Sequence, residues 1–365
     1  VERAAAELFV GRERERAQLE AALTEALGGR GRLCLIAGEP GIGKTRLAEH
    51  VAASAAERGA NVIWGRCWEG EGAPAFWPWV QVIRTHLRQC DVGTLAGRLG
   101  LGGSYVAQVV PEVRELLPDL PTAPPLDSEQ ARFRLYDACS TFLTNAARGT
   151  PLVAVLDDLH WADKSSLLLL QFLVREMADA PLFLLGTYRD VEVSRGHPLG
   201  DVLPQLRRER TVDRILLRGL PEAEVHALLA ALRGDEVPED FAHTISRETA
   251  GNPFFIKEIL RHLLDEGIAH REGDRWVGGG ETDTIHLPES VREVIGRRLA
   301  RLGDTCTKLL TLASVIGQEF GLEVLQRVSD LEGERILEVL EEAVAARVID
   351  ELPNTIARYR FSHTL

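Results

Sequence analysis

Over the first 220 residues, short apolar runs alternate with longer amphipathic stretches. Three segments, at residues 32–38, 151–163 and 181–190, contain strands that are apolar nearly throughout, as expected for parallel strands buried on both faces. Two further runs, at 60–67 and 212–220, are also predicted strands. The stretches between the runs repeat apolar residues with the period of a helix. Strands that alternate with helices predict an α/β fold with a doubly wound parallel sheet.

Two other regions have a different pattern. Residues 69–150 are rich in helix signals and interrupt the alternation, so we expect a helical insertion there, with Ser128 capping its last helix. Later in the chain helical patterns dominate, and two short β-like runs flank a Pro-Asn-Thr turn near the end, which is typical of a winged helix. We therefore predict a parallel-sheet domain at 1–218, a small helical domain at 219–284 and a winged-helix domain at 285–365.

The first predicted strand runs into a glycine-rich loop, Gly38–Thr45, with the sequence GEPGIGKT. This matches G-x-x-x-x-G-K-[ST], in which glycines let backbone N–H groups turn towards an anion and the next helix adds the positive end of its dipole. Lys44 is then expected to reach the β- and γ-phosphates, and the Thr45 hydroxyl to bind Mg²⁺. The alternative is a glycine-rich turn before a helix. The predicted phosphate-binding residues are Glu39, Pro40, Gly41, Ile42, Gly43, Lys44, Thr45 and Arg46.

The choice of lysine in this loop supports the phosphate-binding interpretation. The chain has 42 lysines and arginines, of which only four are lysines, and Lys44 is one of the four. In such a composition, a loop that needed any surface cation would have received arginine. A phosphate cradle instead uses the compact ammonium group of lysine. The first domain is therefore predicted to be a P-loop NTPase.

Two acidic residues, Asp157 and Asp158, end the next fully apolar strand. We expect them near the phosphate loop, because ligands of such sheets bind beyond the carboxyl ends of the strands. Asp157 is predicted to hold Mg²⁺ through water, and Asp158 to act as the general base for the attacking water. Arg189 ends the strand that follows and is placed to stabilise charge on the γ-phosphate. The alternatives are an acidic turn and a surface arginine.

Composition narrows the function classes. The 365-residue chain carries a formal net charge of −13, whereas a protein that grips duplex DNA over a large face is usually basic. Its cysteines are odd in number and form no C-x-x-C pair, which predicts free thiols in a reducing compartment. No apolar run approaches the roughly 20 residues of a membrane span, and no signal peptide is visible. We expect a cytoplasmic protein with no membrane partner and no DNA contact of its own.

Six motifs, FVGRE, GEPGIGKT, VLDDLHWAD, TYRD, GNPFF and RFSH, follow one another along the chain. With them the chain resembles the STAND class of signal-transduction ATPases, within the wider AAA+ group. More narrowly, it resembles the ATPase module of large bacterial LuxR-type transcriptional regulators related to the maltose regulator; similar modules accompany class III nucleotidyl cyclases and Ser/Thr kinases. The resemblance implies an ATP/ADP switch that uses Mg²⁺, hydrolyses slowly and closes around ADP. It also implies an unknown inducer or regulatory protein and nucleotide-dependent self-association.

The same resemblance assigns residues outside the phosphate loop. Val10 and its neighbours Phe9 and Arg12 are expected to line the adenine. Pro253 of GNPFF is expected to pack on the base, and His363 of RFSH to reach the ADP phosphates. From the residues alone, Pro253 is also an ordinary helix start and His363 an ordinary residue of the wing. His160, in the VLDDLHWAD stretch, serves either loop packing or a phosphate network.

The chain also departs from the family pattern. The interval between Lys44 and Asp157 is long for a P-loop core, which the helical insertion explains. No second arginine is placed to act on a neighbouring subunit, which disfavours the main alternative, a ring-shaped remodelling motor. A small-molecule P-loop kinase needs an acceptor pocket and a lid arginine cluster that the sequence does not show. Since the chain stops soon after His363, we expect an excised switch module that reaches DNA only through an effector domain outside it.

Overall fold

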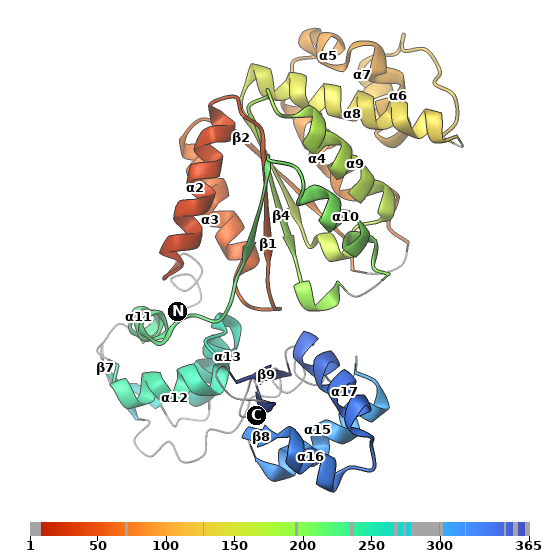
Figure 1. Cartoon of the computed structure of the whole chain (residues 1–365). Coiled ribbons are helices and arrows are strands. Elements are labelled where there is room, and N and C mark those ends of the chain that lie inside the picture. The colour runs from red at the N-terminus through yellow and green to blue at the C-terminus, as the bar shows by residue number, and fades with distance from the viewer. Residues whose placement is uncertain are drawn as a thin grey trace. The chain divides into compact units, whose positions relative to one another are not determined.

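The computed structural model divides the chain into two compact units, Arg12–Leu217 and Val1–Gly11 together with Arg218–Leu365 (Figure 1). The structure describes residues 9–69, 72–126, 128–193, 196–233, 237–265, 269–272, 275–278, 299, 302–317, 319–346, 348–352 and 357–361. Within these ranges no helix combines the length and the apolarity that crossing a bilayer requires. The five cysteines are all free, as predicted.

The first unit is built on a five-stranded parallel sheet, in the order β2-β3-β4-β1-β5. The strands are β1 (Arg32–Ala37), β2 (Asn61–Arg66), β3 (Leu152–Asp157), β4 (Leu182–Tyr188) and β5 (Val212–Leu216). They coincide with the predicted runs, so the α/β parallel-sheet prediction is confirmed. Because β4 lies between β1 and β3, its carboxyl end separates the loop after β1 from the acids after β3.

Helices cover both faces of this sheet, which explains why the central strands are apolar throughout. Every residue of β3 and β4 is buried. Figure 1 shows α2 (Glu13–Leu27) and α3 (Lys44–Glu57) against one face, and α9 (Lys164–Glu176) and α10 (Pro198–Leu206) on the other. Burial on both faces removes polar residues from a strand until it emerges at its carboxyl end. Polar side chains that could bind a ligand or take part in catalysis are therefore expected at the carboxyl ends of β3 and β4.

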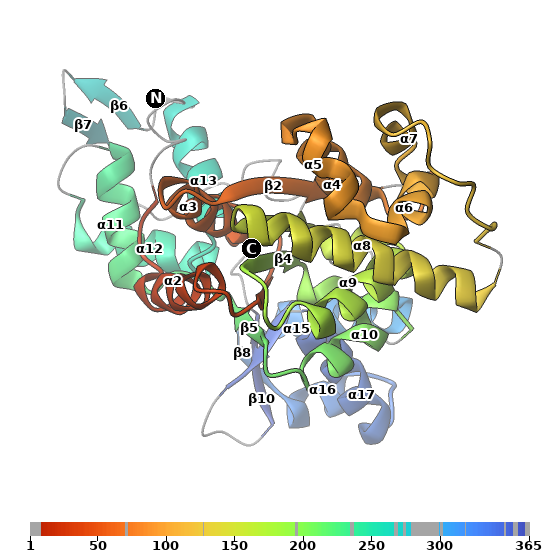
Figure 2. The same cartoon turned by 90° about the horizontal axis from the view of Figure 1, so that it is seen from above.

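The predicted insertion is a helical layer beside the sheet. It consists of α4 (Trp77–Gln89), α5 (Val92–Leu99), α6 (Gly103–Val109), α7 (Glu112–Leu116) and α8 (Glu129–Gly149). Ser128 caps α8 as predicted, because its side chain accepts the Ala131 N–H at 3.1 Å. Figure 2 shows α5 and α6 lying along α8. Their apolar faces join the same hydrophobic core as the sheet, so the insertion is a packed part of this unit.

In the second unit, the residues that the structure describes form two separate hydrophobic cores. The first is formed by α11 (Glu222–Arg233), α12 (Glu239–Thr249) and α13 (Pro253–Asp265), and Val10 packs against it. A short antiparallel pair follows, β6 (Ala269–Glu272) with β7 (Arg275–Gly278). The arrangement matches the helical stretch expected after residue 219, and its extent as a domain stays a prediction.

The second core holds three helices and a small antiparallel sheet. The helices are α15 (Asp304–Ile316), α16 (Leu322–Val328) and α17 (Gly333–Ala345). The sheet has the order β8-β10-β9, in which β10 (Arg358–Phe361) lies between β8 (Glu319–Gly321) and β9 (Ile349–Glu351). The strand β8 was not predicted. The winged-helix interpretation of this region stays a prediction, and His363 lies outside the described residues.

Candidate nucleotide site

The phosphate loop connects β1 to α3 through backbone conformations that favour glycine. Gly43 precedes α3 with φ of 102°, in the left-handed region. Gly38 has φ of 155°, and a Cβ there would lie 2.9 Å from the Leu217 carbonyl oxygen. A side chain at either position would strain the turn. The loop therefore keeps the shape in which backbone N–H groups can face an anion at the start of a helix.

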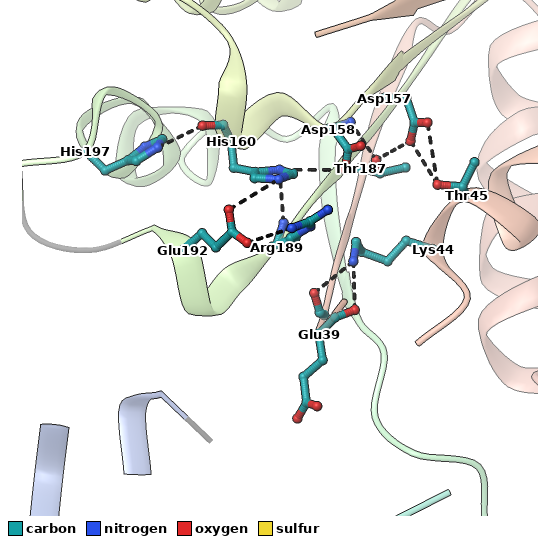
Figure 3. A network of polar contacts seen from close by, with 11 residues as sticks. Glu39, Lys44, Thr45, Asp157, Asp158, His160, Thr187, Arg189, Glu192 and His197 are labelled. Carbon is teal, nitrogen blue, oxygen red and sulfur yellow. Dashed lines mark hydrogen bonds and ion pairs between the residues drawn. The ribbon is translucent and has the colours of Figure 1, made fainter. Parts of the chain in front are cut away.

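Lys44 is held inside the loop as the first residue of α3. It is only 6% exposed, and its Nζ donates to the carbonyl oxygens of Gly38 and Glu39 at 3.0 and 2.8 Å (Figure 3). Burial, together with the smaller effect of the Arg189 charge, lowers the pKa of the Lys44 ammonium to about 8. A nearby negative charge stabilises a buried ammonium group, and the phosphates of a nucleotide would provide that charge.

Asp157 and Thr45 meet where β3 ends beside the loop. The Thr45 hydroxyl donates to Oδ1 of Asp157 at 3.2 Å. Thr187, on the intervening strand β4, donates to the same oxygen at 2.6 Å. Sequence reasoning missed Thr187, although a hydroxyl near the end of an otherwise apolar strand was a signal for it. The strand order thus brings together the two residues that were predicted to bind Mg²⁺.

The donor set at this point suits Mg²⁺. Thr45 offers a hydroxyl oxygen and Asp157 a carboxylate, both of them hard ligands. Mg²⁺ usually keeps several waters and takes phosphate oxygens from the nucleotide, so two protein ligands are enough. The 3.2 Å between the two side-chain oxygens lets them lie on one side of such an ion.

Asp158 follows directly and points in a different direction because its backbone is left-handed, with φ of 59°. Its N–H donates to the Thr187 hydroxyl at 2.9 Å, which holds this conformation. Burial raises the pKa of the Asp158 carboxyl, and the charge of Asp157 raises it further, while Arg189 and Lys44 act in the opposite sense. A carboxylate with a raised pKa is a stronger base, as proton abstraction from water requires.

His160 lies behind Asp158 in a short 3-10 turn, η2 (Leu159–Trp161), and its ring is buried. Burial lowers the pKa of His160 to about 3, so the ring is neutral. Its Nδ1 accepts the Arg189 backbone N–H at 3.4 Å, and its carbonyl oxygen lies 2.9 Å from Nε2 of His197. The ring therefore organises the ends of β3 and β4, which was one of the two roles left open by the sequence.

Arg189 leaves β4 with its guanidinium already engaged. Its Nη1 forms an ion pair with Oε1 of Glu192 at 2.8 Å. The guanidinium carbon also lies 4.8 Å from the ring centroid of Trp161, within cation–π range. Sequence reasoning missed Glu192, and its spacing of three residues from Arg189 was the available signal. Figure 3 shows Arg189 between Glu192 and the side of the site that holds Lys44 and Asp158.

The remaining predicted residues are distributed over both units. Arg12 lies beside the phosphate loop, where its Nη2 donates to the Ile42 carbonyl oxygen at 3.4 Å. Arg46 pairs with Glu49 at 3.0 Å on the surface of α3. Val10 and Pro253 belong to the other unit, the former against its helical core and the latter at the start of α13. Their nucleotide-binding roles, like those of Glu39, Pro40 and His363, stay predictions.

Family models match two parts of the chain. Residues 8–185 match the model described as AAA ATPase domain. Residues 222–275 match a model described as a domain of unknown function. The first match includes the phosphate loop and the acids after β3, and the second covers helices α11 to α13.

Two curated proteins are distant relatives. The hybrid signal transduction histidine kinase G of Dictyostelium discoideum is 25% identical over 181 residues, which is 48% of this chain and 5% of that protein. The uncharacterized protein R02095 of Rhizobium meliloti (strain 1021) is 25% identical over 370 residues, covering 93% of this chain and 33% of that protein. The chain thus spans a third or less of the length of either relative.

Solved structures show weaker likenesses. A variant of RuvB from Thermotoga maritima has a TM-score of 0.42 and 19% identity, with 97% of this chain and 92% of that chain covered. A STAND protein with a tetratricopeptide repeat sensor from Pyrococcus horikoshii has a TM-score of 0.40 and 18% identity, with 98% and 41% covered. TM-scores this low do not decide a family. The match over residues 8–185, on a parallel sheet with an intact phosphate loop, supports an NTPase with a P-loop fold in this part of the chain.

Proposed function

We propose that this chain is the nucleotide-dependent switch of a larger STAND-type signalling protein, and that it binds Mg-ATP, hydrolyses it slowly and closes around ADP. One observation carries the proposal: Lys44, Thr45, Asp157 and Asp158 converge at the carboxyl edge of one parallel sheet. The signalling role is supported by the ordered motifs of the sequence and by the name of the distant Dictyostelium relative. A LuxR-type transcriptional output belongs to the proposal alone.

Each residue of the site has a role in this proposal. The loop N–H groups and Lys44 hold the β- and γ-phosphates, while Thr45 would bind Mg²⁺ and Asp157 would hold it through water. Bound there, Mg²⁺ neutralises charge on the β- and γ-phosphate oxygens. Asp158 accepts a proton from the attacking water, while Arg189 stabilises charge that develops on the γ-phosphate. Each of these roles uses a side chain at the edge of the sheet where the strands end.

The residues of the other unit have proposed roles as well. Val10 and Pro253 are proposed to contact the adenine, and His363 the ADP phosphates, so that closure depends on which nucleotide is bound. An inducer or regulatory protein and nucleotide-dependent self-association complete this proposal. They follow from the resemblance of the motifs to STAND ATPases.

Removal of the Lys44 charge tests the binding role directly. We expect Lys44→Ala to weaken ATP binding by about tenfold or more, because hydrogen bonds to charged groups contribute about 1.5–3 kcal/mol. Isothermal titration calorimetry with a non-hydrolysable ATP analogue measures the change. Lys164→Ala is the matched control, since Lys164 is an exposed lysine at the start of α9. An unchanged affinity in Lys44→Ala would remove the proposed phosphate site.

A further inference from the structure

Glu192 lies between two groups of the candidate site and directs one carboxylate oxygen at each. Its Oε1 pairs with Nη1 of Arg189 at 2.8 Å, and its Oε2 lies 3.5 Å from Nε2 of His160 (Figure 3). The side chain is only 10% exposed. It is positioned by a short 3-10 turn, η3 (Asp190–Glu192), that follows β4. One buried carboxylate therefore bridges the arginine and the histidine.

The contact between Glu192 and His160 is incomplete. Since Nδ1 of the neutral ring accepts the Arg189 backbone N–H, the ring proton is on Nε2. The 3.5 Å to Glu192 exceeds the 2.7–3.2 Å typical of an N–H···O hydrogen bond. Nε2 has no hydrogen-bond partner among the described residues, and His160 is only 3% exposed. A buried N–H without a partner costs free energy, and a movement of Glu192 towards Nε2 would recover it.

The other contact of Glu192 can be exchanged. A guanidinium binds carboxylates and phosphates in the same planar, two-pronged geometry, so a γ-phosphate competes with Glu192 for Arg189. Figure 3 shows the Arg189 side chain between Glu192 and the side of the site that holds Lys44. Trp161 supports the guanidinium through a cation–π contact in the position that the structure shows. Arg189 thus lies within electrostatic reach of the phosphates while it is paired with Glu192.

We propose that Glu192 is an exchange carboxylate, which pairs with Arg189 when the γ-phosphate position is empty and closes on Nε2 of His160 when the γ-phosphate takes Arg189. The inference rests on the proposed function, because it requires a nucleotide held at Lys44. The completed hydrogen bond offsets part of the lost ion pair. The γ-phosphate then selects between them, and Glu192 is a positioning residue that tunes discrimination between ATP and ADP.

The test is Glu192→Gln in the whole chain, with calorimetric titration of ADP and a non-hydrolysable ATP analogue. Glutamine lacks the negative charge that retains Arg189. It keeps a side-chain oxygen that can accept a hydrogen bond from the Nε2–H of His160. We expect analogue affinity to rise about five- to tenfold, as for the loss of one charge-assisted pair, and ADP affinity to stay within about twofold. Glu209→Gln is the matched control, since Glu209 pairs with Arg175 at 3.1 Å elsewhere, and it should change neither affinity.

A double-mutant cycle with Arg189→Gln separates this exchange from a general structural effect. We expect Glu192→Gln to have no further effect on the ratio of the two affinities once Arg189 is replaced. The inference fails if Glu192→Gln leaves the ratio unchanged, lowers analogue affinity, reduces both affinities together, or acts equally without Arg189. If the unaltered protein binds neither nucleotide, the proposed function itself fails, and that outcome is distinct from the others.

Discussion

The phosphate-loop side of the site and its arginine side are built in different ways. Lys44 and Thr45 are placed by a regular junction of strand, glycine loop and helix, and Lys44 is anchored to backbone carbonyls. Arg189 and Glu192 are placed by a strand end and a short 3-10 turn, and side chains hold them. A side chain that is bonded to the backbone of its own loop stays in one position. A side chain that is held by other side chains can change its partner. In the proposed switch, the phosphate-loop side binds the nucleotide and the arginine side responds to it.

The two sides meet at Thr187. Its hydroxyl donates to Asp157, which belongs to the phosphate-loop side, and accepts from the N–H of Asp158, which faces the arginine side. The residue lies on β4, and the sheet order puts β4 between the two other strands that contribute to the site. A single buried hydroxyl therefore sets the directions in which two consecutive carboxylates point.

The largest expected effect separates chemistry from binding. Asp158→Asn should lower the rate of ATP hydrolysis by about 10²–10³-fold, because general base catalysis contributes on this scale. Affinity for ATP should stay within about twofold, since Lys44, Thr45 and Asp157 are untouched, and asparagine tolerates the left-handed backbone. Single-turnover experiments measure the rate of hydrolysis, and calorimetric titration measures the affinity for ATP. Equal losses of rate and affinity would contradict the assignment of Asp158 to catalysis alone.

The next effect is the pH dependence of binding. With a pKa of about 8 in the free protein, Lys44 loses its proton at lower pH than an ordinary lysine. A bound phosphate favours the protonated form, so binding takes up a proton above pH 8 and affinity falls there. We expect ATP affinity to drop about tenfold between pH 7 and pH 9. This is the fall in the protonated fraction of one group whose pKa lies at the middle of that range.

Lys44→Arg provides the control for that titration, because an arginine keeps its charge over the whole range. Its affinity for ATP at pH 7 is expected to be lower, since the larger guanidinium does not fit the loop in the same way. Its dependence on pH between 7 and 9 should be flat. A steep fall in this variant would assign the pH dependence to another group.

The smallest effect concerns the junction between the two sides. Thr187→Val keeps the shape of the side chain but removes both hydrogen bonds of a fully buried hydroxyl. We expect the free energy of unfolding to fall by about 1–3 kcal/mol, because the Asp158 N–H and an Asp157 oxygen lose a partner. Thermal unfolding measures the loss.

Thr144→Val is the matched control for this change. Thr144 is also buried, but its hydroxyl donates to the Ser140 carbonyl oxygen within the same helix, at 2.9 Å. Helix carbonyls of this kind already accept a backbone N–H, so the free energy of unfolding should change by no more than about 0.5 kcal/mol. Equal losses in the two variants would show that Thr187 has no special role at the junction.

Much of this site was readable from the sequence because local patterns specify it. The phosphate loop is a contiguous motif, and apolar runs buried on both faces mark the central strands and their polar ends. Asp157, Asp158 and Arg189 were predicted from those ends. Thr187 and Glu192 were not. A hydroxyl near a strand end and an acid three residues after Arg189 were local signals, but only strand pairing and burial decide that the hydroxyl meets Asp157 and that the acid retains the arginine.

By itself, the sequence determined the class of the sheet, the positions of its strands, the helical insertion and the loop that can hold a phosphate. Those features depend on periodicity and on backbone conformation, which neighbouring residues specify. The tertiary structure alone decided that β4 lies between β1 and β3, that Lys44 is buried enough to shift its pKa, and that Glu192 faces both Arg189 and His160. These depend on strand pairing and burial, which act between residues that are distant along the chain.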